Sequence, residues 1–173
     1  DILVNNAGIT AREPFLEVQL ESWERILRVN LTGTMLCSQA AARIMVESGG
    51  GSIINIASIS GQRGGSHRAA YGASKAGVIN LTAVMAIELG RFGILVNAIA
   101  PGPTDVETSH TPTAQRQVTL SRMAIQRAVR PDEIAAAAAF LASAECAMIT
   151  GHVLNVDGGF NSAGIVLNDI ASH

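Results

Sequence analysis

The fold follows from the stretch Ser52-Ile-Ile-Asn-Ile-Ala-Ser58-Ile-Ser-Gly-Gln-Arg-Gly-Gly-Ser-His-Arg-Ala-Ala-Tyr71-Gly-Ala-Ser-Lys75. It begins with a short apolar run, rich in β-branched residues, that is typical of a buried strand. A glycine-rich connection then leads to an alanine-rich segment of helical character. Four residues along a helix amount to about 40° of rotation, so Tyr71 and Lys75 lie on one face. Ser58 follows the strand, and in an open parallel sheet ligands bind at the edge where the strands end. The stretch therefore predicts a site made of a hydroxyl, a phenol and an ammonium.

The rest of the chain alternates predicted strands with predicted helices. Further strand-like apolar runs lie at residues 1–4, 94–100 and 152–156. Helical patterns or helix-start signals lie at residues 21–47, 70–91 and 131–143. Ser22 is the expected N-cap of the first helix, and Pro131 is the expected first residue of the last. Residues 105–127 are polar and irregular, which favours a lid over packed scaffold.

Composition is typical of one soluble α/β domain. Of 173 residues, 48% are apolar and 15% are charged, and the net charge of −2 offers no basic surface for nucleic acid. Few aromatics beside abundant Ala, Gly and branched aliphatics indicate helices packed on a parallel sheet. Apolar runs stop well short of the ~18 residues of a membrane span. Cys37 and Cys146 have no metal-type spacing and no His/Asp/Glu cluster predicts a metal site, so we expect free thiols in a reducing cytoplasm.

Several motifs, in order along the whole chain, resemble those of the short-chain dehydrogenase/reductase family. They are Asn5-Asn6-Ala7-Gly8, Val29-Asn30-Leu31, Ser58 with Tyr71 and Lys75, Pro101-Gly102, and Asp157-Gly158-Gly159. The resemblance implies a Rossmann-like, doubly wound parallel sheet, with residues 1–173 forming the C-terminal part of a single domain. The glycine-rich dinucleotide fingerprint of a strand, turn and helix is absent from the sequence. We expect the three βα units that carry it in the family, roughly 75 residues, to precede this stretch.

The resemblance implies an NAD(P)-dependent oxidoreductase of a ketone/secondary-alcohol pair, with a catalytic tetrad of Asn30, Ser58, Tyr71 and Lys75. A free tyrosine, with a pKa of about 10, is a poor base at neutral pH, and a nearby ammonium favours its phenolate. Tyr71 is therefore the expected general acid/base, and Lys75 tunes it and binds the nicotinamide ribose. Ser58 is expected to hydrogen-bond the substrate oxygen. Asn30, a poor helix former inside a predicted helix, is expected to hold a water that connects Lys75 to solvent.

The cofactor, NAD or NADP, is expected to contact Tyr71, Lys75 and two turns. The residues implied in these turns are Asn6, Ala7, Gly8, Pro101, Gly102 and Thr104. The family often has Thr where this chain has Val106, and Thr104 or Thr108 is the expected substitute.

The helix at 70–91 predicts self-association. It is apolar nearly all round, and a helix buried on more than one side needs a second surface to cover it. In the family that surface is the same helix of another subunit, which implies a homodimer or homotetramer.

Two kinds of small-molecule substrate stay open, a polyol or sugar and a 3-oxoacyl thioester. Gln62, Arg63 and residues 105–127 are expected to choose between them. One alternative reading is a non-catalytic truncated fragment that only oligomerises. Another is a hydrolase built on Ser58, although no Gly-x-Ser-x-Gly motif accompanies that serine.

Overall fold

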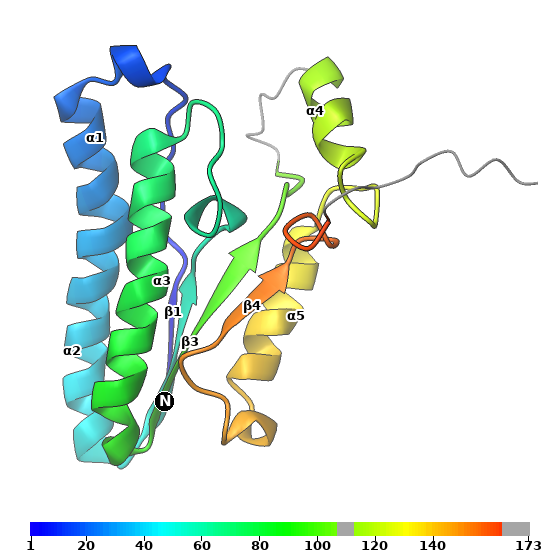
Figure 1. Cartoon of the computed structure of the whole chain (residues 1–173). Helices are drawn as coiled ribbons and strands as arrows, with labels where there is room; N and C mark the ends of the chain where they lie inside the picture. Colours follow the sequence, from blue (N-terminus) through cyan, green and yellow to red (C-terminus); the bar gives the residue numbers. More distant parts are fainter. Residues whose placement is uncertain (107–112, 164–173) are drawn as a thin grey trace, which may run out of the picture.

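A parallel sheet of four strands, with helices on both faces, organises the chain (Figure 1). The computed structural model describes residues 1–106 and 113–163. The strands stand in the order β1 (Ile2–Asn5), β2 (Gly51–Ile56), β3 (Ile94–Pro101) and β4 (Val153–Val156). The helices are α1 (Leu20–Leu27), α2 (Gly33–Ser48), α3 (Ala69–Leu89), α4 (Thr113–Leu120) and α5 (Pro131–Leu141). Short 3-10 helices are η1 (Phe15–Glu17), η3 (Ile59–Gly61), η4 (Gly90–Phe92) and η5 (Ala144–Cys146). The predicted α/β, Rossmann-like fold is confirmed.

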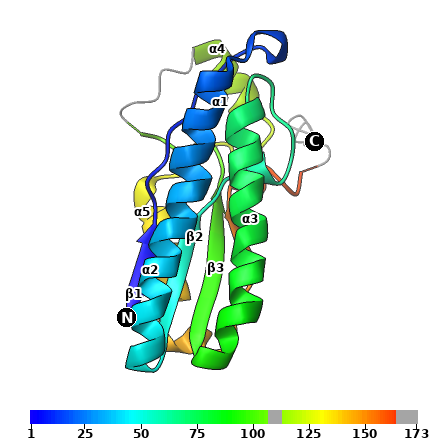
Figure 2. The same ribbon diagram turned by 90° about the vertical axis from the view of Figure 1, so that its left-hand side faces the viewer.

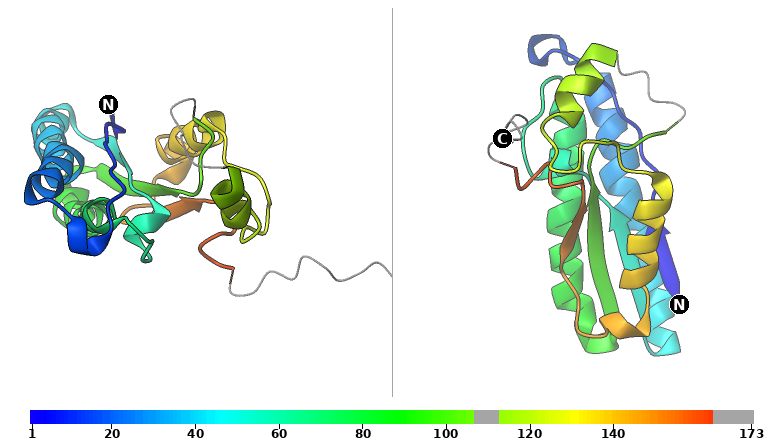
Figure 3. Two further views of the ribbon diagram at one scale, coloured as in Figure 1. Left: turned by 90° about the horizontal axis from the view of Figure 1, so that it is seen from above. Right: turned by 90° about the vertical axis from the view of Figure 1, so that its right-hand side faces the viewer.

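The central strands β2 and β3 direct apolar side chains toward both faces of the sheet, because helices cover both faces. Ile53 and Val96 pack with α2 and α3 on one face, whereas Ile54 and Ile99 pack with α5 on the other. Seen from above, the sheet separates α2 and α3 from α5 (Figure 3). Successive strands are added in one direction throughout, so the crossover through α5 has the opposite hand to the two before it.

The predicted helix at 21–47 is real but interrupted. A π-helical turn, η2 (Arg28–Thr32), joins α1 to α2, and the N–H of Gly33 bonds to the carbonyl of Arg28, five residues back. The two helices run on as one long rod beside α3 (Figure 2). The prediction of Ser22 as N-cap is wrong. Gln19 holds that position in extended conformation and Ser22 lies inside the helix, because Leu20 and Glu21 already have helical geometry.

The segment predicted to be irregular, 105–127, contains the helix α4. Its residues include good helix formers such as Ala114, Gln115 and Arg116, and the polar composition hid them because no apolar stripe marks a packed face. Residues 107–112 of the predicted lid, which include Thr108, lie outside the described residues.

The parallel strands all end at one edge of the sheet, and this edge gathers the predicted site residues. β2 pairs with β3 along its whole length and with β1 from Ser52 to Asn55, which fixes the register of all three strands. The turns after β1, β2 and β3 therefore start side by side. β1 lies at the margin of the sheet, as its side chains Ile2 (57% exposed) and Val4 (44% exposed) show.

A chain of hydrogen-bonded polar side chains, buried except for the half-buried Asn5, fixes α2 and α3 on the sheet. The Nδ2 atom of Asn5 donates to the Oγ of Ser38 on α2 (2.9 Å) and to the Oδ1 of Asn55 on β2 (2.8 Å). Asn55 in turn donates to the Oγ1 of Thr82 on α3 (2.9 Å). Such pairing removes the cost of burying polar groups and specifies one arrangement of helices on the sheet.

We predict that Thr82→Val lowers the free energy of unfolding by about 1–3 kcal/mol, because it leaves a buried N–H of Asn55 without its acceptor. Thr119→Val is the matched control. Both hydroxyls donate to the carbonyl four residues back, but that of Thr119 lies at the surface. The control is expected to change stability by less than about 0.5 kcal/mol. Equal losses in urea denaturation would contradict the role given to Thr82.

Candidate active site

Ser58 leaves its hydroxyl proton free to donate at the carboxyl end of β2. The residue starts η3, and its Oγ accepts a hydrogen bond from the N–H of Ser60 (3.1 Å). The side chain is buried, so its proton is directed to a limited volume. The loop lies directly on α3, because a Cβ on Gly61 would come within 2.6 Å of the Lys75 carbonyl carbon. Only glycine allows this approach, which brings the loop carrying Ser58 against the helix carrying Lys75.

Tyr71 stands in the first turn of α3 between two cations. The guanidinium carbon of Arg68 lies 5.1 Å from the centre of the phenol ring, and the Nζ of Lys75 lies 5.9 Å from it. Tyr71 and Lys75 are one helical turn apart, as the four-residue spacing predicts. They are also the one tyrosine and the one lysine of the sequence.

The ammonium of Lys75 lies against the carboxyl end of β2. Only 5% of the residue is exposed, and Nζ donates to the carbonyl oxygen of Ile56, the last residue of β2 (2.6 Å). Burial lowers the pKa of Lys75 from 10.5 to about 8. An ammonium has three donors, so two remain for other groups at this edge.

Asn30 is fully buried in the π-helical turn and clamps two distant segments together. Its Oδ1 accepts from the N–H of Ile9 (2.8 Å), and its Nδ2 donates to the carbonyl of Ile9 (2.9 Å) and to the Oγ of Ser74 (3.0 Å). Both amide hydrogens are thus used. The clamp holds the turn that follows β1 against α3, and Gly8 lies beside Asn30 and Lys75.

The turns predicted to bind the cofactor lie at the same edge. Asn6, Ala7 and Gly8 follow β1 and are exposed. After β3, the hydroxyl of Thr104 donates to the carbonyl of Gly102 (3.0 Å). A Cβ on Gly102 would lie 2.8 Å from the Cα of Asp157, so close packing against the turn after β4 also requires this glycine.

Sequence reasoning missed the contacts that hold the loop after Ser58 in place. Gln62 donates to the Oδ1 of Asn155 on β4 (2.9 Å) and accepts from the Nδ2 of Asn161 (2.9 Å). Arg63 bonds to the carbonyl of Phe160 (3.1 Å) and stacks over its ring. Their partners lie more than ninety residues away. No spacing pattern signals such pairs.

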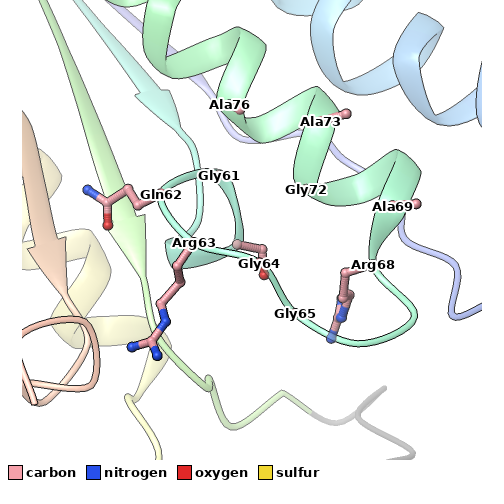
Figure 4. A pocket seen from close by; sticks show the side chains of 11 residues that line it. Gly61, Gln62, Arg63, Gly64, Gly65, Arg68, Ala69, Gly72, Ala73 and Ala76 are labelled. Carbon is pink, nitrogen blue, oxygen red and sulfur yellow. The ribbon is translucent and has the colours of Figure 1, made fainter. Parts of the chain in front are cut away.

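A shallow pocket of about 390 Å³ lies between this loop and α3 (Figure 4). It is lined on the helix by Ala69, Gly72, Ala73 and Ala76. These residues occupy a different face of α3 from Tyr71 and Lys75, since neighbouring positions on a helix are about 100° apart. The pocket is therefore separate from the predicted catalytic groups.

Two classes of site are not found in the described part of the chain. Residues 1–106 and 113–163 contain no group of three or more His, Cys, Asp or Glu residues placed to hold a metal ion. Among the same residues, no helix has both the length and the apolar character needed to cross a membrane. Both cysteines are unbonded, Cys37 at the surface and Cys146 in the interior.

The fold and this edge define a Rossmann-like α/β protein with a serine, a tyrosine and a lysine at the edge where the turns after β1 and β3 lie. A family model described as enoyl-(acyl carrier protein) reductase matches residues 1–161. The chain belongs to the short-chain dehydrogenase/reductase family, as its motifs indicate.

Among curated relatives, the cis-4-hydroxycyclohexanecarboxylate dehydrogenase of Sinomonas cyclohexanicum is 41% identical over 164 residues, which cover 94% of this chain and 66% of that protein. A 3-oxoacyl-[acyl-carrier-protein] reductase of Synechocystis is 42% identical over 160 residues, covering 92% and 64%. A solved gluconate 5-dehydrogenase of Burkholderia cenocepacia, in complex with NADP and tartrate, has a TM-score of 0.92 at 39% identity, over 94% of this chain and 65% of that one. The chain thus spans about two thirds of the length of these relatives.

We predict that stability rises with pH between about 8 and 10.5. In that window the unfolded chain keeps the Lys75 proton and the folded protein has lost it, so raising the pH favours folding. The gain fully develops only above 10.5 and disappears as the pH falls through 8. The shift of the Lys75 pKa corresponds to about 3 kcal/mol. Lys75→Met is the control for urea denaturation at a series of pH values. If this variant keeps the same rise, another group is responsible.

Proposed function

We propose that this protein is an NAD(P)-dependent oxidoreductase that interconverts a secondary alcohol and a ketone. The observation that carries the proposal is the buried ammonium of Lys75, held one turn from Tyr71 and next to the Ser58 loop. Few structural roles require an ammonium to be buried without a carboxylate partner, because its desolvation is costly. Relatives named for acting on a hydroxycyclohexanecarboxylate, a 3-oxoacyl-[acyl-carrier-protein] and gluconate support a hydroxyl or carbonyl carbon as the reacting centre.

Tyr71 moves the proton of the reacting oxygen. In the oxidative direction the phenolate of Tyr71 takes the hydroxyl proton while the carbon–oxygen double bond forms, and in the reductive direction the phenol returns that proton. NAD or NADP, when bound, supplies the acceptor or donor of the hydride. The positive charge of Lys75 stabilises the negative charge that Tyr71 carries in this cycle.

Ser58 orients the reacting oxygen. Its Oγ already accepts from the Ser60 N–H, so its own proton is available for the substrate oxygen. A preoriented donor at the position where negative charge develops stabilises the transition state more than the ground state.

The residues at the edge fit a nicotinamide nucleotide. Exposed backbone at Asn6, Ala7 and Gly8 offers ribose contacts, and Lys75 has two donors left for ribose hydroxyls. Pro101, Gly102 and Thr104 would hold the nicotinamide end from the neighbouring strand.

Asn30 acts by position. Its side chain fixes the turn at Ile9 and the helix at Ser74, and so sets the separation between the ribose turn and Lys75. The water that we expect to connect Lys75 to solvent would sit near this clamp.

We further propose that the protein works as a homodimer or homotetramer in the cytoplasm. The outer side of α2 and α3 exposes large apolar side chains, namely Leu36 (55%), Ile44 (67%), Val84 (41%) and Ile87 (82%). Apolar patches of this kind are uncommon on monomers, and a second copy of the same helices is the partner that matches them. Two unbonded thiols suit a reducing compartment.

Tyr71→Phe tests the catalytic assignment. We expect turnover to fall by at least about 100-fold, because the proton-transferring hydroxyl is lost while ring volume is kept. Dissociation constants for NAD and NADP, measured by fluorescence titration, should change less than about threefold. Substantial residual turnover would refute the acid/base role of Tyr71.

Ile87→Lys tests the assembly. A charge at Ile87, the most exposed of these apolar side chains (82%), is expected to shift the sedimentation coefficient at micromolar concentration toward the monomer. Val118→Lys on α4 is the control, since Val118 is also exposed (65%) but lies away from α2 and α3. A monomeric parent protein would rule out self-association through these helices.

A further inference from the structure

Arg68 lies half-buried beside the ring of Tyr71 and forms no ion pair with an acidic residue of the described part of the chain. Its guanidinium stacks on the Tyr71 ring at 5.1 Å, and its NH1 atom donates to the hydroxyl of Thr10 (2.8 Å). The four ion pairs between described residues all lie elsewhere, at Arg116, Arg127 and Arg130. The hydrogen bond to Thr10 and the Tyr71 ring leave most of the five guanidinium donors unused.

A second positive charge faces the first. Two effects lower the pKa of Arg68. The larger is the burial of its guanidinium, and the second is the positive charge of nearby Arg12. The two arginines reach this point from the loop after β1 and from the start of α3, whose segments also meet through the hydrogen bond from the Glu13 N–H to the His67 carbonyl (3.3 Å).

The wider rim is also positive although the chain is net negative, at −2. Arg63 immediately precedes the Gly64–Gly65 bend, and Arg68 follows it at the start of α3 (Figure 4). Arg63 is engaged with Phe160, as is Arg122. Arg68 therefore stands out as the guanidinium nearest to Tyr71 with donors to spare.

Half-burying the Arg68 guanidinium next to a second positive charge costs free energy, and an anion bound to Arg68 would offset that cost. Arginine presents a planar pair of donors that matches a carboxylate in bidentate fashion. An anion bound there would sit beside the ring of Tyr71 and a short distance from the oxygen that Tyr71 protonates.

We propose that Arg68 binds a carboxylate of the substrate, so that the protein acts on hydroxy acids and oxo acids in preference to neutral alcohols. This inference rests on the proposed function, because it names the substrate class of the same site. The carboxylate takes no part in the redox step. It places the carbinol carbon by holding the other end of a short molecule.

The test compares an acid with its neutral ester in the full chain. Oxidation of cis-4-hydroxycyclohexanecarboxylate and of its methyl ester, and of 3-hydroxybutyrate and its methyl ester, is measured in the parent protein, in Arg68→Gln and in Arg68→Lys. The acid-to-ester ratio of kcat/KM is expected to exceed 1 in the parent and to fall about 30-fold in Arg68→Gln. Arg68→Lys should restore part of it.

Arg91→Gln is the matched control, because Arg91 also stacks on an aromatic ring, that of Phe92 at 4.6 Å, beyond the far end of α3. Its acid-to-ester ratio should equal that of the parent. An equal ratio for acid and ester in the parent, or a ratio unaffected by Arg68→Gln, overturns the inference while the oxidoreductase assignment stands.

Calorimetry separates the inference from the function it rests on. The acid is titrated into Tyr71→Phe and into Tyr71→Phe with Arg68→Gln, each with saturating cofactor. Binding to the first and not to the second supports the carboxylate site even when no alcohol is turned over. Absence of binding to both overturns it. A weakened affinity for NADP in Arg68→Gln, with acid binding unchanged, would show that a cofactor phosphate is the anion and would also overturn it.

Discussion

The buried amide of Asn30 determines whether the parts of this site can meet. It connects the turn after β1, the π-helical turn and α3 through three hydrogen bonds in the interior. The strands alone would bring the turns to one edge, but they do not fix how far α3 stands from that edge. With Ile9 and Ser74 both bound to one planar group, the turn after β1 and the helix that carries Lys75 have a single relative position.

Buried polar side chains also hold helices in place on the sheet. Asn5, Asn55 and Thr82 link the two helices of one face to the first two strands. Lys75 is held by a main-chain carbonyl of the β2 strand and not by a carboxylate, which leaves its charge uncompensated at the site. Under the proposed function, that buried charge serves to stabilise the negative charge that the phenol of Tyr71 carries during proton transfer.

Local patterns predicted much of this architecture, and long-range contacts limited the rest. Strands such as 94–100 and the pairing of Tyr71 with Lys75 follow from periodicity, which depends on neighbours in sequence. The helix at 113–120 was missed because it has no apolar stripe to reveal its period. The stacking of Arg68 on Tyr71, the bond from Gln62 to Asn155 and the use of the Asn30 side chain depend on tertiary packing. Sequence spacing carries no information on such partners.

The π-helical turn also sets the rotational phase of the rod that α1 and α2 form. Buried residues there recur at every fourth position, at Ile26, Asn30, Thr34 and Ser38. In an uninterrupted α-helix each such step advances about 40°, so the series would wind about 120° around the axis and leave the sheet. One extra residue in the wide turn sets the helix back by about 100° and realigns the series on a single inward face. The bulge thus acts as a phase correction, because the same residues wound as a regular α-helix would carry Ser38 about 100° away from the position in which it faces Asn5.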